Sequence, residues 1–451
     1  MRRFEKNLKR REKKKRRRRV LSFQNNLHKF NDKVETFRDI FELYCPAILK
    51  YIVSHEKTSI RIRLGTKKQI HSYLVPKNFS IVENPKEAYA FLSSIVSALL
   101  AYRGCKSLTI DYKLCKNIDL GAQVLLDIVL AEVLAFFKIC EQKGKKLPSL
   151  QLIGKNILEE DIKKMLFSIG TPVNLNGQSI VFQDIIPYKL CIHNRDGVDP
   201  ISISERKDID TTELVDYLLE SLKRMNIFPD YEEIDYLSTI IGEILINAEE
   251  HSTTKYRYSI GYFQEKKSTE GQQYGIFKLI ILNFGSTIYD KFKSPSCANQ
   301  EIVEKMKKLS DSYKKKDYFW GNNFEEETLW TLYSLQEKVS SIDPKVRRRG
   351  NGSIKFIESF LNLSNCSDDN DISKMVILSG NTKIFFDGKY KISDRVIGNE
   401  TCKVMAFNES NDIEDKPDNN YVMKTDYYFP GTIISSRIVF TKPIKYIKNE
   451  T

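Results

Sequence analysis

The stretch EEIDYLSTIIGEILINAEEHS, residues 232 to 252, is the most informative in the chain. Its apolar residues recur at helical spacing and form one stripe, suited to packing on a sheet, at Ile234, Leu237, Ile241, Ile244, Leu245 and Ala248. Glu243, Asn247 and His251 are each four positions apart, so they share a second stripe beside the first. The pattern predicts a helix whose polar stripe lines the wall of a cleft.

A carboxylate and an amide one helical turn apart can divide the work of nucleotide hydrolysis. The amide oxygen of Asn247 is a hard ligand for Mg²⁺, and the carboxylate of Glu243 can orient or deprotonate an attacking water. Taken alone, the same residues also fit an amphipathic helix with three polar flanking positions.

Three segments that follow add to this helix in a defined order. An apolar strand, residues 275 to 282, leads into NFGSTI, residues 283 to 288. The segment RRRGNGSIKFIESF, residues 347 to 360, places a glycine turn directly before a helix, where free backbone N–H groups and the helix dipole suit phosphate. The segment YYFPGTIISSRIVF, residues 427 to 440, alternates as a strand does.

Together these segments resemble the ATP-binding domain of the GHKL class, which has the Bergerat fold. The pattern E-x-x-x-N-A-x-x-H, residues 243 to 251, resembles its N-box and is most similar to anti-sigma-factor serine kinases and histidine-kinase-like ATPases. The resemblance implies Mg-ATP as ligand, with Glu243 as catalytic base and Asn247 as Mg²⁺ ligand. It also places His251 at the nucleotide, and the sixty residues between the glycine boxes as an ATP lid.

The glycine boxes are similar to the family pattern with one departure. The first box has Asn283, where the family has an aspartate that reads the adenine amino group, followed by Gly285. An amide oxygen can accept the same hydrogen bond without charge, so we expect weaker and less selective base recognition. The resemblance assigns the remaining cofactor contacts to Arg349, Gly350, Gly352 and Thr432.

The first half of the chain alternates short strands with helices. The segments SLTIDY (107 to 112) and LQLIG (150 to 154) read as strands, and residues 88 to 102, 121 to 144 and 157 to 170 as helices. Over about 110 residues, this order and the loop NIDLGAQVLL resemble a STAS domain, although an unrelated small α/β domain fits the same rhythm. Signalling members are phosphorylated on a Ser or Thr before the loop glycine; here Leu120 precedes Gly121, so no phosphoacceptor is expected.

These segments give a domain plan for an α/β protein. Residues 1 to 35 are a basic tail and lead-in helix, 36 to 195 a STAS-like α/β domain, and 205 to 445 a GHKL two-layer sandwich, with a mixed sheet and helices on one face. The polar stretches 193 to 212 and 408 to 420 are expected to be a linker and a surface loop.

Composition limits the class of protein. The net charge of +13 is concentrated in residues 1 to 19, where thirteen Lys or Arg face two Glu, so the remainder carries about +2. The eight cysteines show no C-x-x-C pair, and no apolar run approaches the eighteen residues of a membrane span. We therefore expect a cytoplasmic protein without structural zinc and without membrane contact.

Three functions remain open at this point. The first is an ATP-hydrolysing or ATP-gated regulatory switch, and the second an anti-sigma-like serine protein kinase. The third is a non-enzymatic binding protein whose residues 1 to 19 hold nucleic acid weakly through phosphate contacts, with ATP as a structural ligand. A protein partner is expected on the STAS-like domain or the lid, and a homodimer is left open.

Overall fold

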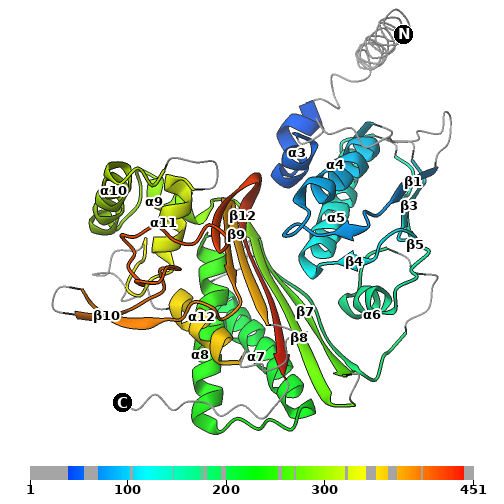
Figure 1. The fold of residues 1–451 in the computed structure, drawn as a ribbon. Helices are drawn as coiled ribbons and strands as arrows, with labels where there is room; N and C mark the ends of the chain where they lie inside the picture. Colours follow the sequence, from blue (N-terminus) through cyan, green and yellow to red (C-terminus); the bar gives the residue numbers. More distant parts are fainter. Residues whose placement is uncertain are drawn as a thin grey trace, which may run out of the picture.

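The computed structural model consists of two α/β units that share a large interface (Figure 1). It describes residues 39–54, 70–101, 105–145, 147–173, 175, 180–194, 200–251, 256–268, 271–319, 324–341, 352–363, 373–397 and 400–440. The basic tail lies outside the described residues, and so does the segment SIRIRLG, residues 59 to 65, whose period-two alternation predicts a strand.

The first unit is built on a three-stranded parallel sheet in the order β1-β3-β5. Its strands are β1 (Ile70–Leu74), β3 (Ser107–Asp111) and β5 (Gln151–Lys155), and a short parallel pair joins β2 (Asn78–Phe79) to β4 (Asn117–Ile118). Its helices are α3 (Ala47–Ser54), α4 (Pro85–Ala101), α5 (Leu120–Gln142) and α6 (Glu160–Ile169). The helices and strands expected between residues 88 and 170 are therefore present.

Helix α5 is the central helix of the first unit. It starts where the Asp119 side chain accepts a 2.5 Å hydrogen bond from the Ala122 N–H, and the chain leaves it at Gly144, whose φ is +80°. Among the described helices, α5 is the one long and apolar enough to cross a membrane, but 78% of its most apolar window is buried. That burial is typical of a core helix in a soluble protein.

The second unit is built on a five-stranded antiparallel sheet in the order β6-β7-β8-β12-β9. Its strands are β6 (Ile185–Asn194), β7 (Tyr256–Lys267), β8 (Gln273–Phe284), β9 (Lys374–Phe386) and β12 (Val422–Phe440), with a separate hairpin of β10 (Ser393–Ile397) and β11 (Glu400–Val404). Its helices are α7 (Pro200–Arg224), α8 (Tyr231–His251), α9 (Ile288–Lys293), α10 (Gln300–Lys315), α11 (Glu326–Ser334) and α12 (Gly352–Leu363).

Three element boundaries differ from the sequence-based expectation. Strand β6, expected in the first domain, pairs with β7 and forms one edge of the second sheet. The expected linker at 193 to 212 is largely the first half of α7, which begins at Pro200, a residue suited to the first helical position. The amphipathic pattern of EETLWTLYSLQEKVSS predicts a helix over residues 326 to 341, and helix α11 ends earlier, at Ser334.

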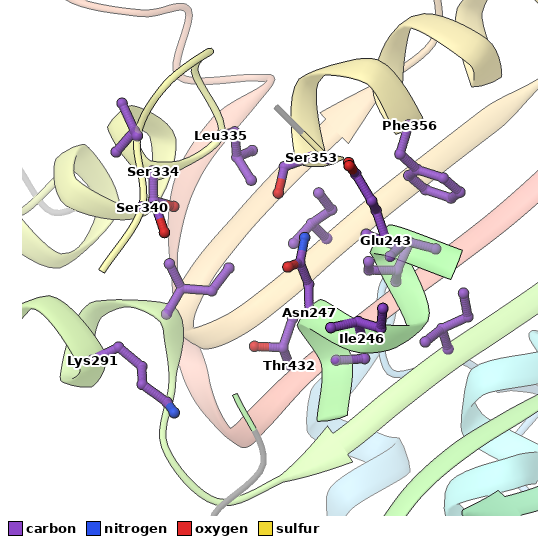
Figure 2. Close-up of a pocket in the computed structure, with 18 of the residues that line it drawn as sticks. Glu243, Ile246, Asn247, Lys291, Ser334, Leu335, Ser340, Ser353, Phe356 and Thr432 are labelled. Atoms are coloured by element: carbon purple, nitrogen blue, oxygen red, sulfur yellow. The ribbon is translucent and has the colours of Figure 1, made fainter. Parts of the chain in front are cut away.

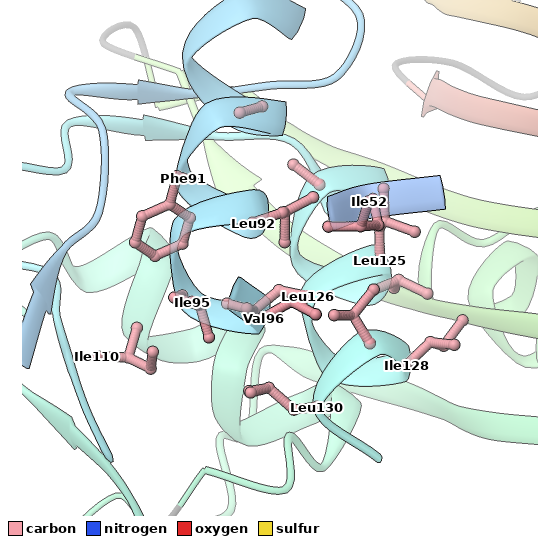
Figure 3. Close-up of a cluster of buried hydrophobic side chains, with 14 of the residues drawn as sticks. Ile52, Phe91, Leu92, Ile95, Val96, Ile110, Leu125, Leu126, Ile128 and Leu130 are labelled. Atoms are coloured by element: carbon pink, nitrogen blue, oxygen red, sulfur yellow. The ribbon is translucent and has the colours of Figure 1, made fainter. Parts of the chain in front are cut away.

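The two faces of the five-stranded sheet have different partners. Apolar side chains of α7, α8 and α12 pack on one face together with Ile281 and Ile434. The sheet was expected to be mixed, but all its described strand pairings are antiparallel. The other face, including Leu282 and Ile433, shares one core with α3, α4 and α5 of the first unit (Figure 3). Because successive strand residues point to opposite faces, neighbours along β8 and β12 belong to different cores.

Aromatic residues of β12 strengthen contact between the units. The rings of Tyr427 and Tyr89 stack with centroids 5.7 Å apart and planes 4° apart, and the Tyr51 hydroxyl donates to the Tyr428 carbonyl. These contacts lie at the irregular part of β12 just before Thr432. The first unit therefore holds the strand segment that leads into the cavity described below.

Candidate functional site

One cavity of about 280 Å³ lies between helix α8, helix α12, the α9 segment and the helix-covered face of the large sheet (Figure 2). It gathers residues that the sequence singled out in four separate segments, namely Glu243, Asn247, Asn283, Gly352 and Thr432. Its remaining floor is apolar and includes Ile281, Ile377 and Ile434. The cavity thus combines a polar wall with a surface on which a flat, apolar ring can pack.

Helix α8 supplies the polar wall. Its start is fixed by reciprocal bonds: the Asp230 N–H donates to Glu233 Oε2 at 2.7 Å, and the Glu233 N–H to Asp230 Oδ1 at 2.9 Å. The apolar stripe is buried on the sheet, which turns Glu243 and Asn247 towards the cavity, as expected for a flanking stripe. His251 is the last residue of α8, and its side chain lies outside the described part of the structure.

Asn283 lies at the bottom of the cavity and is fully buried. Its amide nitrogen donates to the Ala248 carbonyl of α8, and its amide oxygen accepts from the Thr432 N–H at 3.0 Å. The side chain therefore ties α8 to β12. The oxygen that the resemblance assigns to adenine already accepts one backbone hydrogen bond, which leaves it a second lone pair.

The backbone beside Asn283 is packed too closely for side chains. At Gly431, whose φ is +144°, a β-carbon would lie 2.2 Å from the Asn283 carbonyl oxygen. Gly285 also has a positive φ, of +124°, and its N–H donates to the Pro430 carbonyl at 3.0 Å. Both glycines are needed for β8 and β12 to meet at this point.

Thr432 has a partner that the sequence did not indicate. Its hydroxyl lies 2.9 Å from the Ser379 hydroxyl of β9, and Ser379 in turn accepts from the Ile288 N–H at 2.9 Å. Ser379 therefore links the floor of the cavity to the start of α9. Only the pairing of β9 with β12 brings it there, so local sequence offers no signal for it.

Gly352 begins α12 directly against the polar wall. A β-carbon at this position would lie 2.7 Å from Glu243 Oε2 and 3.0 Å from Asn247 Nδ2. The N-terminus of α12, where the first N–H groups of a helix have no intrahelical partner, therefore faces the Glu243 and Asn247 pair. Arg349 and Gly350, also expected at the nucleotide, lie outside the described residues.

The wall opposite α8 was not predicted. It consists of Ile288, Lys291 and Phe292 of α9 and of residues 334 to 341 after α11. Helix α9 starts with a capping box between Thr287 and Asp290, a T-x-x-D signal that is visible in the sequence. Of the lining residues that the structure describes, Lys291 is the one with a cationic side chain (Figure 2).

The segment expected to be a lid divides into two parts. Residues 340 and 341 line the cavity, and the Asn299 side chain holds Ser340 through a 2.9 Å bond from Nδ2 to the Ser340 carbonyl. The Lys-rich helix α10 lies away from the cavity lining; its Tyr313 hydroxyl bonds to the carbonyls of Ile413 and Asp415, each at 2.9 Å. The expected surface loop at 408 to 420 is thus the anchor of α10.

A buried charged cluster lies beside the cavity. We call His193, Asp210, Arg257 and Glu249 the His193 cluster; they come from β6, α7, β7 and α8, and at most 9% of each residue's surface is exposed. Burial alone would raise the pKa of Asp210, but the hydrogen bond from His193 and the charge of Arg257 outweigh it and lower that pKa. No local sequence pattern indicates this cluster, because its members are far apart in the chain.

Comparisons with known proteins found no match, so the assignment of a function depends on the geometry of the site. No protein-family model matches the sequence, and neither a curated protein nor a solved structure is significantly similar to it. In the described part of the chain, no three His, Cys, Asp or Glu side chains are grouped to hold a metal ion.

Proposed function

We propose that the cavity binds Mg-ATP and that the protein is an ATP-hydrolysing or ATP-gated switch of the GHKL class. The observation that carries this proposal is the convergence of Glu243, Asn247, Asn283, Gly352 and Thr432 on one cavity. These residues span 190 positions of the chain and belong to four separate sequence motifs. An amphipathic helix with incidental polar residues would not require the other segments to meet it.

The donor set fits a magnesium–phosphate group. The amide oxygen of Asn247 and the carboxylate of Glu243 are hard oxygen donors, and triphosphate oxygens would complete the shell. The N-terminus of α12 faces both side chains and suits an anion. Glycine at position 352 lets α12 start this close to Glu243 and Asn247, because a β-carbon there would collide with both side chains.

Each side chain then has a defined role. Asn247 would hold the cation through its amide oxygen, and the cation would supply positive charge that neutralises the phosphate groups. Glu243, one turn earlier on the same wall, orients the attacking water and accepts its proton. The adenine ring of ATP would pack on the apolar floor near Asn283 and Thr432, and Ile288 and Phe292 would close the opposite side.

The serine kinase alternative receives less support from the attached first unit. Its loop at residues 118 to 121 lacks an acceptor hydroxyl and also packs against the large sheet: a β-carbon on Gly121 would lie 3.3 Å from Ile433 Cδ1. That contact is on the face opposite the cavity. A phosphate on this loop would therefore be buried and remote from the nucleotide, so a kinase substrate would have to be another protein.

Other proposals concern location and partners. Seven cysteines are free thiols in the described structure, which supports a reducing, cytoplasmic setting. Binding of nucleic acid by residues 1 to 19 stays a proposal, as do a protein partner and a homodimer. Removal of residues 1 to 19 should reduce the salt dependence of any such nucleic-acid binding.

Calorimetric titration with Mg-ATP tests the main proposal. The wild-type chain should bind one ATP, Asn247→Ala should abolish Mg-ATP binding, and Asn84→Ala in the first unit should leave it unchanged. Glu243→Gln should still bind ATP but release phosphate about 10²- to 10⁴-fold more slowly, because only the proton acceptor is lost. Equal ATP affinity of the wild type and Asn247→Ala would refute the assignment of the site.

A further inference from the structure

Three consecutive residues near the end of α8 face three different parts of the structure. Asn247 lines the cavity, the Ala248 carbonyl accepts from Asn283, and Glu249 faces His193. Helix ends have backbone groups without intrahelical partners and tend to fray. The residue proposed to bind the cation is thus in a part of the helix that needs external anchors.

The His193 cluster supplies one of these anchors, and its contacts are buried. Asp210 Oδ2 accepts from Arg257 Nη2 at 2.5 Å and lies 3.0 Å from His193 Nδ1. The other ring nitrogen of His193, Nε2, lies 3.7 Å from Glu249 Oε1. One imidazole therefore stands between a carboxylate of α7 and a carboxylate of α8.

Strand register connects the cluster to the cavity floor. Across the sheet, His193 pairs with Arg257, Arg257 with Asn283, and Asn283 with Thr432. Paired residues in an antiparallel sheet point to the same face, so these four side chains form one row under α8. The two anchors of the helix end, His193 and Asn283, belong to this same row.

We propose that Glu249, which faces His193 of the His193 cluster, is a positioning residue that fixes the orientation of the Asn247 amide for the magnesium ion. This inference rests on the proposed function, because it assigns a role towards the same ligand. The physical reason is geometric: ligand atoms must be held within about 0.5 Å of their productive position, and residues behind a ligand set that position. Loss of the Glu249 contact frees the last turn of α8 and with it the amide.

The test compares ATP affinity with Mg²⁺ and with EDTA, by calorimetry on the full chain. Mg²⁺ should raise the ATP affinity of the wild-type chain. Glu249→Ala should lose most of this increase, a loss of about 10- to 100-fold, with little change in metal-free ATP binding. Glu249→Gln, which keeps the length and a hydrogen-bonding end, should restore most of the gain. Glu233→Ala, at the opposite end of the same helix, is the matched control and should keep the full gain.

A purely structural role predicts a different result. It would weaken ATP binding equally with and without Mg²⁺. That outcome overturns the inference, and so does an increase of ATP affinity with Mg²⁺ that is the same in Glu249→Ala as in the wild type. In both cases the proposed function stands. If thermal unfolding shows that Glu249→Ala does not fold, His193→Gln replaces it with the same expected loss. A wild-type chain that binds no nucleotide overturns both proposals.

Discussion

A β-carbon on residue 352 would lie 2.7 Å from Oε2 of Glu243, so helix α12 starts in contact with the polar wall of α8. It would also lie 3.1 Å from the β-carbon of Glu243, which is fixed to the helix backbone and cannot rotate away. Residue 352 therefore has to be glycine because of its contact with Glu243, and not only because the sequence predicts a glycine turn before the helix.

Substitution Gly352→Ala should consequently weaken Mg-ATP binding on the order of tenfold, or about 1.4 kcal/mol. The added methyl group displaces Glu243 and Asn247 together, and because the β-carbon of Glu243 cannot move aside, it should also lower the unfolding temperature. Calorimetry and thermal unfolding measure the two effects. Ser353→Ala, at the next cavity-lining position, removes an atom without adding one and should bind ATP more tightly than Gly352→Ala. Equal affinity of Gly352→Ala and wild type would contradict the contact.

Placing at position 283 the aspartate that the GHKL class has there should not improve ATP binding. In Asn283→Asp the donor to the Ala248 carbonyl is lost and a carboxylate oxygen faces that carbonyl inside the protein. Such a buried loss should destabilise the fold by about 2–3 kcal/mol, seen as a lower midpoint of chemical unfolding. Asn381→Asp removes a comparable 2.9 Å donor, to the Thr425 carbonyl, away from the cavity and should leave ATP affinity intact. Tighter ATP binding by a stable Asn283→Asp would show that the amide is not structural.

Neighbouring isoleucines of β12 offer a test of the two faces of the sheet. Ile433 packs on the first unit, whereas Ile434 lines the cavity. Either Ile→Ala change should cost about 2–5 kcal/mol of stability through the cavity it leaves. Only Ile434→Ala should also reduce ATP affinity at temperatures where both variants are folded. Unfolding of the wild type should be a single transition for both units, because they share one core; two separate transitions would contradict that.

The sequence predicted the parts of the site that depend on local pattern. Helix α8, with Glu243 and Asn247 on one stripe, follows from its 3.6-residue period, and Gly352 and Thr432 follow from a turn before a helix and an alternating strand. The approach of these segments to one another follows from the family resemblance. In each case a short run of residues carried enough information.

The remainder depends on contacts between distant segments. Strand β6 reads equally well as the last strand of the first unit, and only its pairing with β7 assigns it to the second. The His193 cluster joins residues from four elements, and Asn283 has its role from Ala248 and Thr432. Pairings at such sequence separation leave no local periodicity, so no pattern within a window can show them.

A buried carboxyl of α5 should make stability depend on pH. Burial raises the pKa of Asp127 from 3.8 to about 7, although hydrogen bonds from Thr171 and Gln123, at 2.7 and 2.8 Å, work in the opposite direction. Because the raised pKa belongs to the folded state, the folded form binds the proton more tightly than the unfolded form. The free energy of unfolding should therefore fall as pH rises from about 4 to about 7 and become flat above, by up to about 4 kcal/mol.

Asp127→Asn should remove this dependence, since the amide keeps the acceptor for Thr171 and Gln123 but cannot ionise. Chemical unfolding at a series of pH values measures it, and the variant should be the more stable protein above pH of about 7. Asp161→Asn is a control of opposite sign: hydrogen bonds from Lys266 and Gln264 outweigh burial and lower the pKa of Asp161, so its contribution is lost on acidification. If wild type and Asp127→Asn show parallel stability curves between these limits, Asp127 is ionised in the folded protein at no cost and the inferred desolvation is absent.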